Sequence, residues 1–104
     1  MFEKVMIANR GEVALRILRT LREMGIESVL ACSAADMRAQ VPLADRVICI
    51  GPEDPDRSYL NSYQLIGAAL TCGADAIHPG YGFLAEDAGF ISLCREMGVG
   101  FVGP

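Results

Sequence analysis

VMIANRGEVALRILRTLREMGIESVLAC, residues 5–32, carries the pattern of a strand, a helix and a second strand in succession. Residues 5–8 form a short apolar run, which is typical of a strand buried on both faces of a parallel sheet. Residues 12–24 carry apolar side chains at helical spacing, and Gly25 follows where a left-handed helix end is favoured. Because residues 28–32 form the next apolar run, this stretch predicts a β-α-β unit.

The rest of the chain continues this alternation of strands and helices. We expect strands over residues 46–50, 75–78 and 99–102, helices over residues 62–72 and 86–97, and a short helix between residues 33 and 45. Such alternation favours a parallel sheet with right-handed crossovers. We therefore predict a Rossmann-like, three-layer α/β domain whose five-stranded, mainly parallel sheet has the strand order 3-2-1-4-5.

The predicted strand order leaves the two faces of the sheet unequally covered. The helix over residues 12–24 and the segment 33–45 share one face, while the helices over residues 62–72 and 86–97 cover the other. We expect the first face to meet another subunit or another domain.

The composition is that of one globular domain. Hydrophobic residues make up 52% of the 104 residues and charged residues 21%, which excludes a disordered polar chain. No apolar run approaches the ~20 residues of a membrane helix, and the N-terminal segment lacks the apolar core of a signal peptide. A net charge of −4 gives no support for nucleic-acid binding. We expect a cytoplasmic domain with neither a membrane nor a nucleic-acid partner.

Cysteine usage indicates packing and not chemistry. Cys32, Cys49, Cys72 and Cys94 include no CxxC pair, and each lies inside an apolar strand or helix pattern. Because cysteine packs as a small hydrophobic residue, we expect four buried, reduced thiols. The sequence shows neither a metal-ligand set nor a catalytic triad.

Two loops are expected to meet where such a sheet binds ligands, beyond the carboxyl ends of the first and fourth strands. The first, residues 9–12, holds one glycine and matches neither GxGxxG nor GxxxxGK[ST], which disfavours nucleotide binding by this domain alone. Asn9 also stands where a phosphate-receiving signalling domain of this fold class requires an acidic residue. The second loop, residues 78–85, is therefore the candidate for ligand contact.

That second loop belongs to the segment HPGYGFLAED, residues 78–87. Pro79 stiffens the entry, while Gly80 and Gly82 permit positive φ and close backbone approach. The loop is either a tight turn or a ligand-facing rim, and its lack of Lys, Arg, Ser and Thr argues against unaided phosphate binding. His78 is either a packed residue or a general base, and the sequence shows no orienting partner for a base.

Charged residues on the helix over residues 12–24 form a possible contact surface. Arg19 and Glu23 are four residues apart, and Arg16 lies close to the same helix face. Such a face is either solvated or an interface, and the under-covered sheet face beside it makes the two alternatives about equally well supported.

Four segments in register resemble the N-terminal domain of biotin carboxylase. They are IANRGEVALRILR (residues 7–19), LADRVICIGP (43–52), SYLN (58–61) and HPGYGFLAED (78–87), and the resemblance covers essentially all 104 residues. The family includes the biotin carboxylase subunit of acetyl-CoA carboxylase and the equivalent parts of propionyl-CoA, methylcrotonyl-CoA and pyruvate carboxylases.

The resemblance implies a pre-ATP-grasp domain of an ATP-grasp ligase. Such an enzyme uses ATP, Mg²⁺ or Mn²⁺, and bicarbonate to carboxylate biotin on a carrier protein, works with a carboxyltransferase and forms a homodimer. In acetyl-CoA carboxylase this reaction serves fatty acid synthesis. The family's ATP-grasp and C-terminal domains lie downstream of this region, so residues 1–104 are expected to be inactive alone. A free-standing dimerisation or interaction module with this fold is the alternative.

The resemblance also implies roles for individual residues. Tyr81 and Gly82 match the loop that borders the biotin pocket, with His78, Pro79 and Gly80 shaping that loop. Arg19 and Glu23, together with Arg16, match the helix of the dimer interface, and no catalytic residue or metal ligand is implied for this chain. Two segments depart from the family pattern: Ala85-Glu86-Asp87 replaces Ser-Glu-Asn, and Gln40-Val41-Pro42 replaces a histidine-valine pair.

Overall fold

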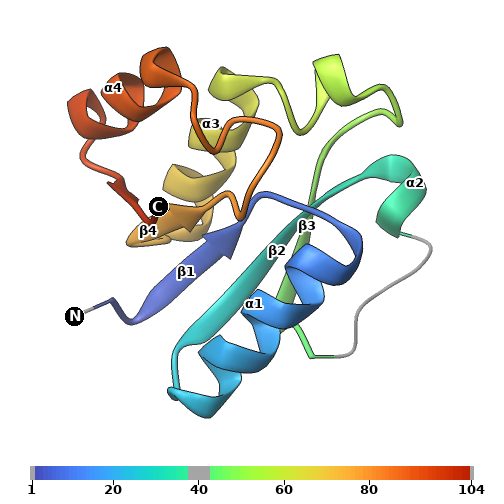
Figure 1. Ribbon diagram of the computed structural model, residues 1–104, viewed down its shortest axis with the longest axis vertical. Helices are drawn as coiled ribbons and strands as arrows, with labels where there is room; N and C mark the ends of the chain where they lie inside the picture. The colour runs from blue at the N-terminus through green and yellow to red at the C-terminus, as the bar shows by residue number, and fades with distance from the viewer. Residues whose placement is uncertain (1, 38–42, 104) are drawn as a thin grey trace.

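The computed structural model describes residues 2–37 and 43–103 and contains one five-stranded sheet in which all paired strands are parallel. The sheet order is β3-β2-β1-β4-β5, which confirms the predicted fold class and strand order (Figure 1). The strands are β1 (Lys4–Ile7), β2 (Glu27–Ser33), β3 (Arg46–Gly51), β4 (Ala76–His78) and β5 (Gly100–Phe101).

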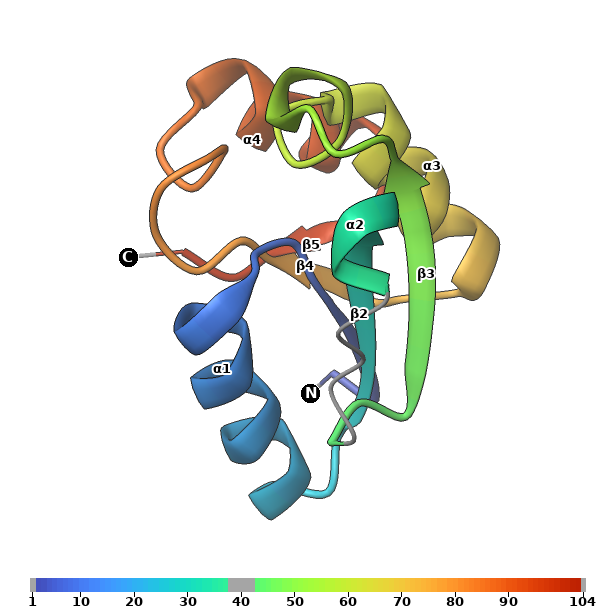
Figure 2. The same cartoon turned by 90° about the vertical axis from the view of Figure 1, so that its right-hand side faces the viewer.

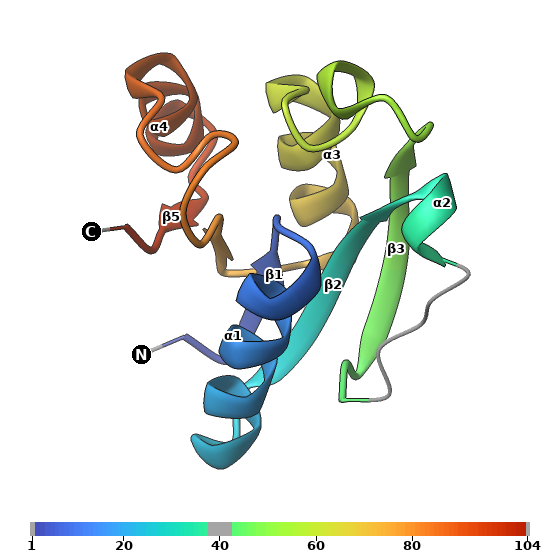
Figure 3. The same cartoon turned by 45° about the vertical axis from the view of Figure 1, so that its right-hand side comes forward.

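Helices lie on both faces of the sheet. They are α1 (Gly11–Glu23), α2 (Ala34–Met37), the 3-10 helix η1 (Pro55–Arg57), α3 (Ser62–Cys72) and α4 (Ala88–Glu96). Figures 2 and 3 show α1 on one face and α3 and α4 on the other. The short helix expected between residues 33 and 45 is α2, whereas the variant segment Gln40-Val41-Pro42 lies outside the described residues.

Alternation along the strands divides the apolar core into two layers. Val5 and Ile7 of β1 pack with Leu18 of α1 on one face. Met6, between them in sequence, packs on the opposite face with the residues of α3 and α4, including Phe90. Because both faces of β1 are covered, its continuous apolar run follows directly from its central position.

Local capping signals set the ends of α3 as expected. Asn61 is the N-cap, with its side-chain oxygen accepting a hydrogen bond from the Gln64 amide at 3.1 Å. Gly73 closes the helix in the left-handed conformation at φ 73°. These caps give hydrogen-bond partners to backbone groups that would otherwise be unpaired at both helix ends.

Three expectations were wrong in detail. Helix α4 begins at Ala88 and not at Glu86, because Asp87 caps it by accepting a hydrogen bond from the Phe90 amide at 2.8 Å. Met97, expected on the apolar face of that helix, is its C-cap residue and is 47% exposed. Cys49 is exposed because β3 is an edge strand, while the other three cysteines are buried.

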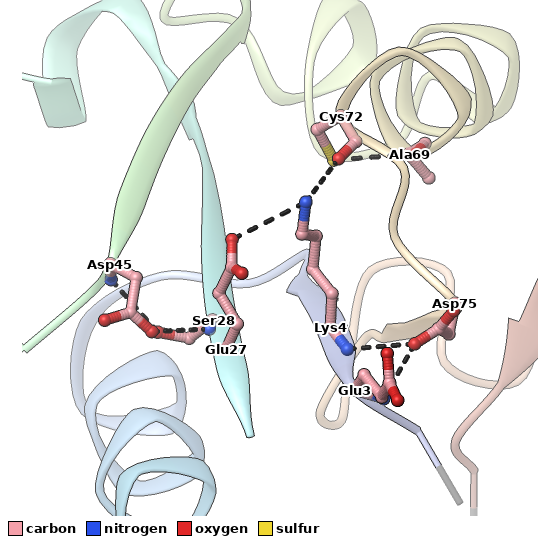
Figure 4. A network of polar contacts seen from close by, with 8 residues as sticks. All are labelled: Glu3, Lys4, Glu27, Ser28, Asp45, Ala69, Cys72 and Asp75. Carbon is pink, nitrogen blue, oxygen red and sulfur yellow. Dashed lines mark hydrogen bonds and ion pairs between the residues drawn. The ribbon is translucent and has the colours of Figure 1, made fainter. Parts of the chain in front are cut away.

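Polar contacts tie the strands together at the amino end of the sheet, opposite the candidate site (Figure 4). The Asp75 carboxylate accepts hydrogen bonds from the amides of Glu3 and Lys4 at 2.7 and 2.9 Å. These two hydrogen bonds lower the pKa of Asp75, and the bond from the Lys4 amide has the larger effect. Ser28 and Asp45 are joined reciprocally, and the Ser28 amide donates to Asp45 at 2.8 Å. The contacts anchor β1 to β4 and β2 to β3.

Candidate functional site

The loops after β1 and β4 meet because the two strands end at the same level. Ile7 pairs with His78 in the parallel register, and the Ala8 amide donates to the His78 carbonyl at 3.0 Å. Beyond this point the chain turns into α1 after β1 and into the loop of residues 79–87 after β4. This is the switch point of the sheet, where ligands bind in folds of this class.

Asn9 holds the two loops together. Its Nδ2 donates to the carbonyl oxygens of Pro79 and Tyr81 at 2.7 and 2.8 Å, and its Oδ1 accepts from the Arg10 amide at 2.8 Å. The side chain is 4% exposed, so these bonds replace those that water would make. Sequence reasoning missed this role, although an amide at the end of a buried strand is a signal for such partners.

Gly80 lies where the loop passes closest to α1. Its φ is 70°, and a Cβ added there would lie 2.5 Å from Cγ1 of Val13. Gly82 has a similar φ of 78°, but a Cβ there would meet nothing within 4 Å. Both glycines therefore adopt a positive φ that favours glycine. Only at Gly80 is there also no room for a side chain.

An apolar groove of about 760 Å³ runs between α1 and this loop. Val13 and Ile17 of α1 line one side, and Tyr81 and His78 line the other. The Tyr81 side chain is 69% exposed although its carbonyl is held by Asn9. The loop thus presents an aromatic ring on a fixed backbone, which is the geometry of a binding rim.

His78 stabilises the turn that begins the loop. Its Nδ1 accepts a hydrogen bond from the Gly80 amide at 3.1 Å. Burial lowers the pKa of His78 below its ordinary value of 6.5, so the neutral ring is favoured at neutral pH. A neutral ring with Nδ1 as acceptor suits a loop-shaping role.

Acidification should destabilise the fold through His78. Above pH 6.5 the ring is neutral in both states, but below it the unfolded chain binds the proton more readily, so the free energy of unfolding decreases until the lower folded pKa is reached. Urea unfolding at pH 7.5 and pH 5.5 measures this decrease. His78→Asn is the matched control, because its amide oxygen can accept from Gly80 without titrating. Equal pH dependence of the two proteins would contradict the assignment.

A second group of residues supports the loop from the α3 face. Phe83 has a φ of 44°, and its ring stacks on that of Tyr59 with centroids 5.0 Å apart. The Tyr59 hydroxyl donates to Asp36 at 2.6 Å, and Asp36 is paired with Arg10 at 2.8 Å. Sequence reasoning did not single out Tyr59 or Asp36, since their contacts join segments far apart in the chain.

The charged face of α1 lies outside the groove for the most part. Arg16, Arg19 and Glu23 are all exposed, and Arg16 alone of the three lines the groove. Within residues 2–37 and 43–103 the ion pairs are Lys4–Glu27 and Arg10–Asp36, so Arg19 and Glu23 are not paired with each other. Their charges are available to a partner.

The described part of the chain contains no group of three or more His, Cys, Asp or Glu side chains that could hold a metal ion. It also contains no helix long and apolar enough to cross a membrane.

Comparison with known proteins shows that the whole chain matches one family. The family model "Biotin carboxylase, N-terminal domain" matches residues 1–104. Biotin carboxylase 1 of Bacillus subtilis and the biotin carboxylase of Haemophilus influenzae are 54% and 55% identical over 100% of this chain. The chain spans 23% of the length of each of these relatives.

A solved structure shows the same fold. It is the biotin carboxylase domain dimer of 2-oxoglutarate carboxylase from Hydrogenobacter thermophilus, in complex with MgADP, ADP and bicarbonate. The TM-score is 0.91 at 46% identity, and the match covers 100% of this chain and 23% of that one.

Proposed function

Because this chain belongs to the biotin carboxylase N-terminal domain family, we propose that it forms one wall of the biotin pocket in a biotin carboxylase. The complete enzyme would use ATP and bicarbonate to carboxylate biotin on a carrier protein. The observation that carries this proposal is the rim itself, in which Tyr81 is exposed while its backbone is held by Asn9. Gly82, adjacent to it, leaves the approach open.

The nucleotide, the metal and bicarbonate are proposed to bind outside the described residues. The Hydrogenobacter relative holds MgADP and bicarbonate in a chain of which this one covers 23%. In the present sequence, the loops at the carboxyl end of the sheet match no phosphate-binding motif. We therefore propose that the residues described here bind and orient biotin, and that the rest of the enzyme supplies the ATP and Mg²⁺ sites.

Truncating Tyr81 tests this proposal in the complete enzyme. Tyr81→Ala should raise the KM for free biotin about tenfold, equivalent to about 1.4 kcal/mol, because an aromatic wall of the pocket is lost. Steady-state carboxylation of biotin measures the change. Tyr63→Ala is the matched control, since Tyr63 is 80% exposed on α3 and does not line the groove. An unchanged KM for biotin in the Tyr81→Ala enzyme would exclude the rim assignment.

We further propose that the exposed charges of α1 contribute to a homodimer interface. Arg19 and Glu23 are exposed and unpaired with each other, Arg16 lies nearby, and the Hydrogenobacter relative is a dimer. Charges of opposite sign presented by one helix can pair with the same charges of a second copy across a two-fold axis.

Charge reversal tests the interface. Arg19→Glu in the complete enzyme should weaken the dimer at least tenfold by placing two acidic side chains together, and adding Glu23→Arg should partly restore it. Sedimentation equilibrium measures both dissociation constants. Arg95→Glu, on α4 at the opposite face of the sheet, changes the net charge equally and should leave the dimer intact. Equal weakening by Arg19→Glu and Arg95→Glu would assign the effect to net charge alone.

The proposed context is acetyl-CoA carboxylase in the cytoplasm. A biotin carboxyl carrier protein would then deliver biotin, and a carboxyltransferase would pass the carboxyl group to acetyl-CoA for fatty acid synthesis. The support is that the two relatives at 54–55% identity are named simply biotin carboxylase.

A further inference from the structure

Phe83 adopts a backbone conformation that a bulky side chain disfavours. Its φ is 44°, and it is the one non-glycine residue with positive φ within residues 2–37 and 43–103. A residue of this kind stays in that conformation only where the surrounding structure holds it there. Because Phe83 directly follows Tyr81 and Gly82, the contacts that hold it also set the direction of the rim.

Tyr59 supplies the contact that holds Phe83. The two rings are stacked, with centroids 5.0 Å apart and an angle of 17° between their planes. Tyr59 is 1% exposed, whereas Phe83 is half-buried. The buried Tyr59 ring therefore supports the Phe83 ring of the loop.

The hydroxyl of Tyr59 is fixed by two polar partners, one of which is held in turn by Arg10. Its hydroxyl donates to Oδ2 of Asp36 at 2.6 Å and accepts from the Ser33 amide at 3.2 Å. Oδ1 of Asp36 in turn accepts from Arg10 at 2.8 Å. Burial, and then the hydrogen bond to Asp36, raises the pKa of Tyr59, so the hydroxyl remains a donor at neutral pH. The ring is thereby tied to the ends of β1 and β2.

The loop is thus held by contacts on both sides of Tyr81. Asn9 holds the carbonyls of Pro79 and Tyr81, and the Tyr59 ring holds Phe83. We propose that Tyr59 is a positioning residue for biotin binding, whose ring fixes Phe83 and so aims Tyr81 without touching the ligand. This inference rests on the proposed function.

The test uses the complete enzyme, with free biotin as the probe. Tyr59→Leu and Phe83→Leu should each raise the KM for biotin about three- to tenfold, while the KM for ATP changes less than about twofold. The double variant should be no worse than the more affected single variant, because both remove one stacking contact. Phe83→Leu leaves the buried Tyr59 in place, so it tests the contact even if Tyr59→Leu does not fold.

A control separates positioning from general loss of stability. Phe90→Leu removes another aromatic ring of the same core layer, which is 1% exposed and packs edge-on against Phe101 with ring centroids 5.9 Å apart. It should lower the melting temperature and leave the KM for biotin unchanged.

Two results would overturn the inference. If Tyr81→Ala raises the KM for biotin but Tyr59→Leu and Phe83→Leu do not, or if their effects add, the positioning role is wrong while the rim assignment stands. If Tyr81→Ala also leaves this KM unchanged, the rim assignment is wrong and the positioning role falls with it.

Discussion

Gly80→Ala is expected to lower the free energy of unfolding by about 2–5 kcal/mol. About 1–2 kcal/mol comes from placing a side chain at positive φ, and about 1–3 kcal/mol from inserting a methyl group into packed surroundings. The new Cβ would lie 2.5 Å from Cγ1 of Val13 and 3.1 Å from Nδ2 of Asn9. Relieving that overlap requires the Val13 side chain to rotate or α1 and the loop to move apart.

Gly82→Ala is the matched control for Gly80→Ala. Its φ of 78° carries the same backbone cost, but the added methyl group meets no atom within 4 Å. We expect a loss of about 1–2 kcal/mol, measured by urea unfolding of the same chain. If the two variants lose equal stability, the close approach of Gly80 to α1 is not a determinant of the fold.

Asn9→Asp is expected to cost about 3–5 kcal/mol at neutral pH, the loss typical of a buried charge left without its partner. The substitution conserves shape but replaces the Nδ2 donor with a carboxylate oxygen facing the carbonyls of Pro79 and Tyr81. Protonation restores a donor, so the folded state should raise the pKa of the new carboxyl group. The penalty is then present above that pKa and decreases as the pH falls through it.

Asn61→Asp is the control for the chemical change. Asn61 caps α3 as an acceptor, and aspartate fills that role equally well, so the expected change is within about 0.5 kcal/mol. Urea unfolding of both variants between pH 4 and pH 7 measures the difference. If Asn9→Asp leaves the free energy of unfolding unchanged, the Asn9 amide does not hold the loop.

The loop glycines show what residue type alone predicts about local structure and what it does not. Gly80 and Gly82 were identified as positive-φ positions from their type alone, because glycine is the residue that tolerates this conformation. Their different surroundings could not be identified in this way. Val13, whose side chain would overlap a Cβ at position 80, comes from α1, which is separated from the loop in the sequence by β2, α2, β3, η1, α3 and β4.

The start of α4 and the exposure of Cys49 show where local patterns are insufficient. Glu86 and Asp87 both suit a helix N-terminus, and the hydrogen bond from Phe90 selects Asp87. Cys49 lies in an apolar strand pattern, but it is exposed because β3 is at the edge of the sheet, a position that follows from the strand order and not from the local pattern.

The sequence by itself determined the alternation of strands and helices, because hydrophobic periodicity, glycine ends and caps are local signals. The sheet order followed from that alternation and the right-handed crossover rule, and the family followed from four motifs in register. The tertiary structure alone decided how the loop of residues 79–87 is held. Asn9 reaches Pro79 and Tyr81, and Tyr59 supports Phe83, through contacts between segments that become neighbours only when the parallel strands pair. Hydrogen-bond direction and ring stacking depend on distances that no local pattern encodes.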